Sequence, residues 1–234
     1  MAVDILPPTN NNQITQSVAL AIPTGITMID TLPAIVGDIF NIFTLPAGGV
    51  ASEALKALFK KRSDAAREIM LYEISRGQIR FNQADMEESV AIVYRYLRAA
   101  QEGAARINLT LLAQVLSGQA RLGLVKADDF LYYADILTPM LRDEILLIGC
   151  ILRHWEAAIE QEQSPTERMR TATINSQKDL IPDVFEDLAE FRAVADGLRR
   201  TGFLSIQATA GGGDFLGPSP VLIRLARLVK FEVV

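Results

Sequence analysis

A continuous apolar run at residues 145–152 constrains the fold of this chain more than any other feature. The run lies inside a longer segment of helical character. A helix that is apolar on every side must be enclosed by other elements, since no face of it suits water. Half of the 234 residues are hydrophobic, so the chain has enough apolar material for that enclosure. We therefore expect residues 145–152 at the centre of a helical bundle.

The segments around this run show apolar residues at three- and four-residue spacing, which predicts further helices. One helix is expected over residues 52–77, and a second over residues 82–118, with Gly103 and Asn108 as the positions of a kink or a break. The helix that carries the apolar run starts at residue 127, and Pro139 bends it or splits it.

The last fifty residues follow a different order of elements. Residues 183–200 predict an acidic amphipathic helix, and alternating apolar residues at 203–209 predict a strand. The glycines at 211–213 predict a chain reversal, and residues 221–229 predict a final helix. A helix, a two-stranded wing and a closing helix together indicate a winged-helix-like module.

The expected fold is therefore mainly α, with a helical bundle followed by a small winged-helix-like module that contains a short β-hairpin. The bundle is expected at residues 26–163 and the module at 182–234. A linker is expected at 164–181, because this segment contains the clearest loop signal, Ser164 followed by proline. Residues 1–25 are expected to form a flexible tail.

Charge and cysteine usage indicate the compartment. The net charge of −5 argues against a protein whose whole surface binds nucleic acid. Cys150 is the single cysteine, so no intramolecular disulfide forms, and a reducing compartment is expected. Residues 1–12 lack the pattern of a secretion signal. We expect a cytoplasmic protein.

The apolar segment at residues 26–50 is about long enough to cross roughly 30 Å of hydrocarbon as a helix. Asp30, Asp38, Pro33 and Pro46 interrupt it, and an aspartate at bilayer depth costs about 2.5–3.5 kcal/mol. We favour a buried helix followed by a turn. A membrane span and an element that contacts a membrane surface or a partner are the alternatives.

Catalytic chemistry is poorly supported by the residue inventory. His154 is the only histidine, and its nearest carboxylate, Glu156, lies on a different helical face. Cys150 has apolar neighbours that do not activate a thiol. The glycines at 211–213 precede Asp214, which would repel a phosphate. We expect no catalytic, cofactor-binding or metal-ligating residues, and no enzyme.

Two groups of basic residues are the candidate binding patches. For the first group a solvated helix face is the simpler interpretation, and binding to phosphate or anionic lipid is the alternative. For the second group, packing or protein contact by the winged-helix-like module is favoured over DNA binding. The helix that precedes the wing is acidic, which disfavours DNA binding by the module. The patch residues are Lys56, Lys60, Lys61 and Arg62 in the first group and Arg224, Arg227 and Lys230 in the second.

Three stretches, at residues 54–62, 65–68 and 129–134, resemble uncharacterised helical proteins of bacterial and prophage genomes. The ending, with residues 198–204 before a glycine-rich turn, is similar in layout to the abortive-infection alpha group. The resemblance covers residues 50–230 in the order of their elements. It implies a role in phage exclusion and carries no catalytic motif.

The leading hypothesis is a non-enzymatic bacterial or prophage protein that acts by contact with a protein partner or by self-association, through residues 26–50. One alternative is a DNA-binding regulator that uses the basic carboxy-terminal patch. Another is a membrane-active effector that uses residues 26–50.

Overall fold

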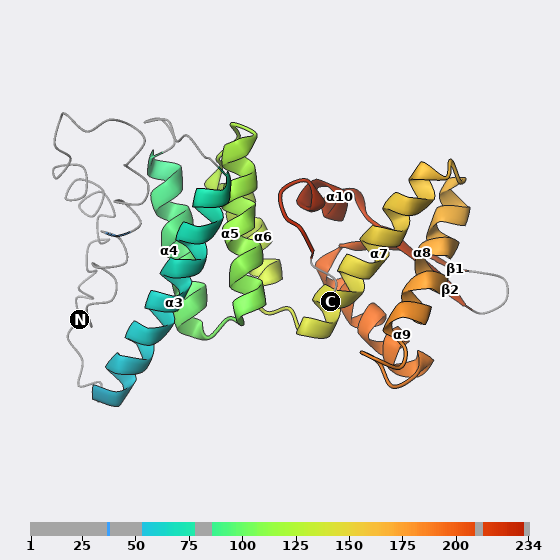
Figure 1. Cartoon of the computed structure of the whole chain (residues 1–234), viewed down its shortest axis with the longest axis horizontal. Coiled ribbons are helices and arrows are strands. Elements are labelled where there is room, and N and C mark those ends of the chain that lie inside the picture. The colour runs from blue at the N-terminus through green and yellow to red at the C-terminus, as the bar shows by residue number, and fades with distance from the viewer. Residues whose placement is uncertain (1–36, 38–52, 78–85, 209–212, 232–234) are drawn as a thin grey trace, which may run out of the picture.

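The computed structural model describes residue 37 and residues 53–77, 86–208 and 213–231 (Figure 1). The expected tail at 1–25 lies outside the described residues. So does the apolar segment at 26–50 except for Gly37, which is helical and buried. Among the described helices, none combines the length and the apolar character needed to cross a membrane.

The described chain is mainly helical with one antiparallel hairpin near its carboxy terminus, which confirms the mainly α class. The helices and strands in chain order are α3 (Glu53–Gly77), α4 (Met86–Glu102), α5 (Arg106–Arg121), α6 (Ala127–Leu137), α7 (Arg142–Glu160), α8 (Pro165–Leu180), α9 (Leu188–Gly197), the 3-10 helix η2 (Leu198–Thr201), β1 (Leu204–Ala208), β2 (Asp214–Pro218) and α10 (Pro220–Ala226).

Helices α3 to α6 pack together as one group (Figure 1). Ala66, Ile69 and Met70 form the buried stripe of α3 against its neighbours. The expected second helix is two helices, α4 and α5, because the chain turns at Gly103 with a φ of 99° that suits glycine. The expected break at Pro139 is also confirmed, since it lies between the end of α6 and the start of α7.

Helix α7 packs mainly against α8, strand β2 and α9. Residues 145–152 are all buried, as their apolar character predicted. The expected linker at 164–181 contains α8 instead. Ser164 accepts a hydrogen bond from the Glu167 amide and Pro165 occupies the first turn, so this pair is a helix start rather than a loop.

The acidic helix does not begin at Asp183 as expected. Residues 181–184 form a turn, and α9 begins at Leu188. The physical reason is the cap at Asp187: its side chain accepts from the Glu190 amide at 2.9 Å, and the Glu190 carboxylate accepts from the Glu186 amide at 2.6 Å.

The hairpin pairs β1 with β2, with Ile206 opposite Leu216. Strand β2 lies against α7 and α8, where the Leu216 amide donates to the Thr173 hydroxyl at 2.7 Å. A Cβ atom at Gly217 would lie 2.9 Å from Met169 Cγ and 3.2 Å from a ring carbon of Trp155. The hairpin is therefore held closely against the α7–α8 pair.

A buried asparagine holds the connection between α6 and α7. The side-chain nitrogen of Asn108, on α5, donates to the carbonyl oxygens of Leu137 at 2.6 Å and Met140 at 2.9 Å, and lies 3.3 Å from that of Thr138. These carbonyls are at the end of α6 and in the turn that follows. A helix end leaves its last carbonyls without helical partners, so this amide satisfies groups that burial would otherwise penalise.

A nearly buried ion pair fixes the first turn of α7 to η2. Glu144 forms two hydrogen bonds with Arg200, at 2.5 Å and 2.7 Å, and accepts from the Leu141 amide at 2.9 Å. The Glu144 side chain is only 4% exposed, while that of Arg200 is 50% exposed. Burial acts to raise the pKa of Glu144, but the Arg200 and Leu141 hydrogen bonds outweigh it and lower that pKa.

The segment after α10 returns to the first group of helices and lies on α5. Arg121 donates to the Arg227 carbonyl oxygen at 3.2 Å, and the Lys230 amide donates to Gln114 Oε1 at 2.9 Å. Between these bonds, a Cβ at Gly118 would lie 2.6 Å from the Leu228 Cα and carbonyl oxygen. Glycine at this position is required by the close approach of another backbone.

Replacing Asn108 by aspartate tests its role. Asn108→Asp places a carboxylate oxygen against carbonyl oxygens, so we expect the free energy of unfolding to fall by at least about 2 kcal/mol in urea denaturation. The matched control is Asn175→Asp on α8, for which the structure shows no comparable set of carbonyl acceptors. Equal losses for the two variants would contradict the role of Asn108.

The Glu144–Arg200 pair predicts a pH dependence of stability. Because the folded-state pKa of Glu144 is lowered, its contribution is present above the unfolded pKa and is lost as the pH falls through the folded pKa, that is below about pH 5. We expect Glu144→Gln to lower the free energy of unfolding at pH 7 by about 2 kcal/mol and to reduce its decline on acidification. Urea denaturation at a series of pH values measures both effects.

The control for that series is Glu167→Gln, which removes an exposed pair with Arg170 and should change stability by less than about 1 kcal/mol. An unchanged acid sensitivity in Glu144→Gln would exclude Glu144 as the titrating group.

Candidate functional site

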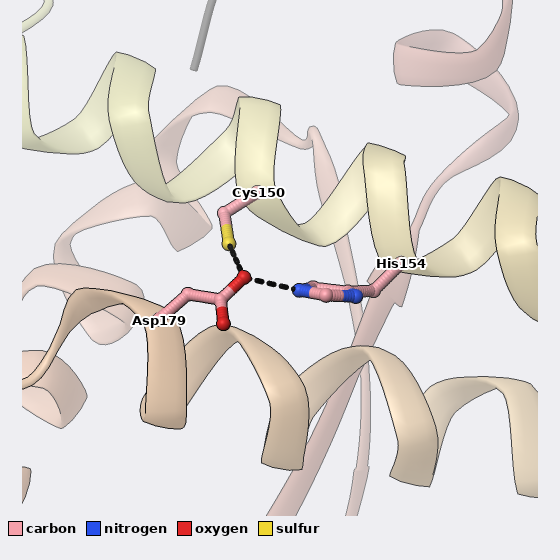
Figure 2. Close-up of side chains that lie close together, drawn as sticks. All are labelled: Cys150, His154 and Asp179. Carbon is pink, nitrogen blue, oxygen red and sulfur yellow. Dashed lines mark hydrogen bonds and ion pairs between the residues drawn. The ribbon is translucent and has the colours of Figure 1, made fainter. Parts of the chain in front are cut away.

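Helices α7 and α8 bring a thiol, an imidazole and a carboxylate together (Figure 2). Cys150 and His154 lie four residues apart on α7, so one helix face presents both side chains. Asp179 comes from the last turn of α8 and points toward them. The residues 161–164 that join the two helices are few, which makes α7 and α8 antiparallel neighbours.

A single carboxylate oxygen is the centre of this cluster. Asp179 Oδ2 lies 2.7 Å from His154 Nε2, 2.5 Å from Arg153 Nη2 and 3.9 Å from Cys150 Sγ. Arg153 Nη2 also lies 3.5 Å from Cys150 Sγ. Because a carboxylate only accepts, Nε2 carries the proton in the His154–Asp179 hydrogen bond.

The environment keeps the thiol neutral and the carboxylate charged. Burial raises the pKa of Cys150, so the thiol is protonated at neutral pH. The hydrogen bond from His154 lowers the pKa of Asp179, and Arg153 adds to that effect. The cluster therefore contains a permanent negative charge beside a thiol that is not activated as a nucleophile.

The order of the three groups does not match a nucleophilic triad. In such a triad the imidazole lies between the nucleophile and the carboxylate, so that it takes the proton of the nucleophile. Here the carboxylate oxygen contacts both the thiol and the imidazole. The arrangement can hold two helices together or bind a cation, but it is not arranged for acyl transfer.

The ligand atoms have the composition of a transition-metal site. One sulfur, one ring nitrogen and one carboxylate oxygen all lie within 4.8 Å of one another. The cysteine is buried, the histidine is half-buried and the aspartate is exposed, so the cluster opens to solvent on one side.

Cys150 and His154 were considered from the sequence, but Asp179 was not. His154 has no carboxylate on its own helical face among its neighbours in the sequence, and residues 164–181 were expected to be a linker. A helix start at Ser164 would have predicted an antiparallel partner for α7, with Asp179 close to the level of Cys150.

The basic residues of the first predicted patch lie in the first half of α3. Lys60 forms an exposed ion pair with Asp64 at 2.8 Å, and Arg62 donates to the Gln101 carbonyl oxygen at 3.1 Å. Lys61 is exposed, and Lys56 is partly exposed. This patch therefore consists of cations that are partly engaged with their own bundle.

The second predicted patch lies on and after α10. Arg224 contacts Tyr133 of α6, whose pKa is raised by burial against the opposing effect of that arginine. Arg227 and Lys230 are exposed, although their backbone groups bind α5. Lys230 also lines, with Arg106, a hollow of about 360 Å³ beside α5 and the start of α7. The two patches thus belong to different elements of the fold.

The chain was also compared with known proteins. No protein-family model, no curated protein and no solved structure matches it. The geometry of its own residues is therefore the basis for any proposal about its function.

Proposed function

We propose that this is a non-enzymatic protein that acts by protein contact, and that the first half of α3 binds a second copy of the chain. The observation that carries the proposal is an exposed apolar stripe of Leu55, Leu58 and Phe59. Their side chains are 38–43% exposed, although their spacing is that of a packed helix face.

This stripe continues the face that α3 uses inside its own bundle. Residues 55, 59, 62, 66 and 69 follow one another at three- and four-residue intervals, and burial along α3 begins at Ser63 and Ala66. In Figure 1 the first half of α3 extends beyond the ends of α4 and α5. A face of this kind suits packing against another helix.

Charge complementarity favours a second copy over an anionic membrane. Lys56, Lys60 and Lys61 lie around the apolar stripe, so the partner surface should be acidic. The chain itself has 28 acidic and 23 basic residues, which makes a second copy an acidic partner. The same net charge of −5 disfavours approach to an anionic lipid surface.

The carboxy-terminal elements support contact with protein rather than with DNA. The order α7, α8, α9 and hairpin is compatible with a winged-helix-like module, in which α9 would be the recognition helix. However, Arg199 pairs with Asp196 and Asp214, and Arg200 pairs with Glu144. These cations are engaged within the protein, while Glu186, Asp187 and Glu190 are exposed around the start of α9.

The proposal includes a cytoplasmic location, which the single buried thiol supports. A role in phage exclusion follows from the resemblance of the sequence to the abortive-infection alpha group, and it belongs to the same proposal.

Light scattering after size-exclusion chromatography tests self-association. We expect the wild-type chain to show a mass above that of the monomer at micromolar concentration. Leu58→Glu should show the monomer mass, because burying the glutamate charge in an apolar contact is unfavourable. The control is Leu124→Glu, a leucine outside α3 that is 56% exposed, and this variant should keep the wild-type mass.

A wild-type chain that is strictly monomeric would contradict the proposed binding of a second copy. Binding of the wild-type chain, but not of Leu58→Glu, to anionic vesicles in a flotation experiment would assign the same surface to a membrane instead.

A further inference from the structure

We propose that Cys150, His154 and Asp179 form a binding site for Zn²⁺ or a similar transition-metal ion, and that Arg153 occupies this site in the absence of metal. This inference goes beyond the proposed protein contact and does not depend on it, since the first half of α3 is not part of the cluster.

The ligand types are those that zinc takes in proteins. Cysteine sulfur, histidine nitrogen and aspartate oxygen bind zinc at about 2.3 Å, 2.0–2.1 Å and 2.0–2.2 Å. The thiolate disfavours Mg²⁺ and Ca²⁺, which prefer oxygen ligands. The cluster therefore selects a borderline-soft ion over the abundant hard cations.

The distances from Asp179 to the other two ligand atoms approach those of a tetrahedral site, and all three ligand atoms lie within 4.8 Å of one another. Ligand atoms around tetrahedral zinc lie roughly 3.3–3.6 Å apart, as the bond lengths require. Asp179 Oδ2 lies 2.7 Å from His154 Nε2 and 3.9 Å from Cys150 Sγ, so one distance must open and the other must close by a few tenths of an ångström. Rotation of the Asp179 side chain, which is 39% exposed, can supply that change.

The backbone that presents the ligands is rigid. Cys150 and His154 belong to a helix in which residues 145–152 are buried, and Thr173 of α8 is bonded to strand β2. Ligands at positions i and i+4 of one packed helix keep their separation without help from the metal. The helix backbone that carries the ligands is thus in place before an ion enters, while the Asp179 and Arg153 side chains must move.

Arg153 marks the place where a cation is favoured. One guanidinium nitrogen lies 2.5 Å from Asp179 Oδ2 and 3.5 Å from Cys150 Sγ, and the side chain is 49% exposed. The guanidinium can therefore swing into solvent when a metal ion takes its position. Arg153 then competes with the metal, and its removal should strengthen binding.

The proton balance of the step is simple. Zinc binds the Cys150 thiolate, so the thiol proton is released to solvent. His154 coordinates as a neutral ring through Nε2, so the one remaining ring proton is on Nδ1 and any second ring proton is released to solvent. A water molecule completes the fourth position on the solvent side of the cluster.

Cobalt and zinc titrations of the full chain test the site. We expect reduced, metal-free protein to bind one Co²⁺ with a thiolate-to-cobalt charge-transfer band and tetrahedral d–d bands. Zinc should displace the cobalt and raise the thermal midpoint of unfolding. Cys150→Ser should abolish the charge-transfer band, and Asp179→Asn should weaken zinc binding by at least about tenfold in a chelator competition.

The arginine variants separate a metal site from a simple clamp between the helices. Arg153→Ala should tighten zinc binding by a few-fold, up to about tenfold, because an exposed competing ion pair is lost. Arg170→Ala, another exposed arginine of an ion pair on the same helix pair, should leave the zinc affinity unchanged.

Circular dichroism of each metal-free variant shows whether it is folded. The proposal is overturned if wild-type protein gives no thiolate–cobalt band. It is also overturned if folded Cys150→Ser binds zinc as tightly as wild type, or if Arg153→Ala binds it more weakly.

Discussion

The amide of Asn108 is the contact on which the arrangement of the two helix groups depends. It binds the last carbonyls of α6 and the turn that leads to α7, where proline has already ended helical hydrogen bonding. The Glu144–Arg200 pair then fixes the first turn of α7 to η2. Because α7 presents Cys150 and His154 toward α8, the geometry of the cluster depends on interactions that are formed elsewhere along the helix.

Several charged side chains of the described residues join elements that are distant in the sequence. Arg200 pairs with Glu144 of α7, and Arg199 pairs with Asp214 of the hairpin. Helices α4 and α6 are joined by the Arg95–Asp135 ion pair and by Glu88, which accepts a hydrogen bond from the Ala127 amide. Two candidate surfaces are found among the described residues. One is the exposed apolar stripe in the first half of α3, and the other is the cluster between α7 and α8.

Local signals in the sequence predicted the helices better than the contacts between them. The apolar run at 145–152, the turn at Gly103 and the break at Pro139 were predictable, because each depends on one short segment. The start of α9 was wrong because Asp187 and Glu190, rather than Asp183, form the cap. The cluster was missed because His154 and Asp179 meet only after α8 folds back on α7, and the signal for α8, the helix start at Ser164, was interpreted as a linker.

The backbone contact between Gly118 and Leu228 links distant parts of the sequence, and it has a consequence for biosynthesis. Helix α5 is synthesised more than a hundred residues before the segment after α10 that covers it. During translation, helices α3 to α6 therefore form before the segment after α10 covers α5. Until then this surface of α5 is accessible to a chaperone or an early partner. The packing of the amino-terminal helices is thus completed last, although these helices are synthesised first.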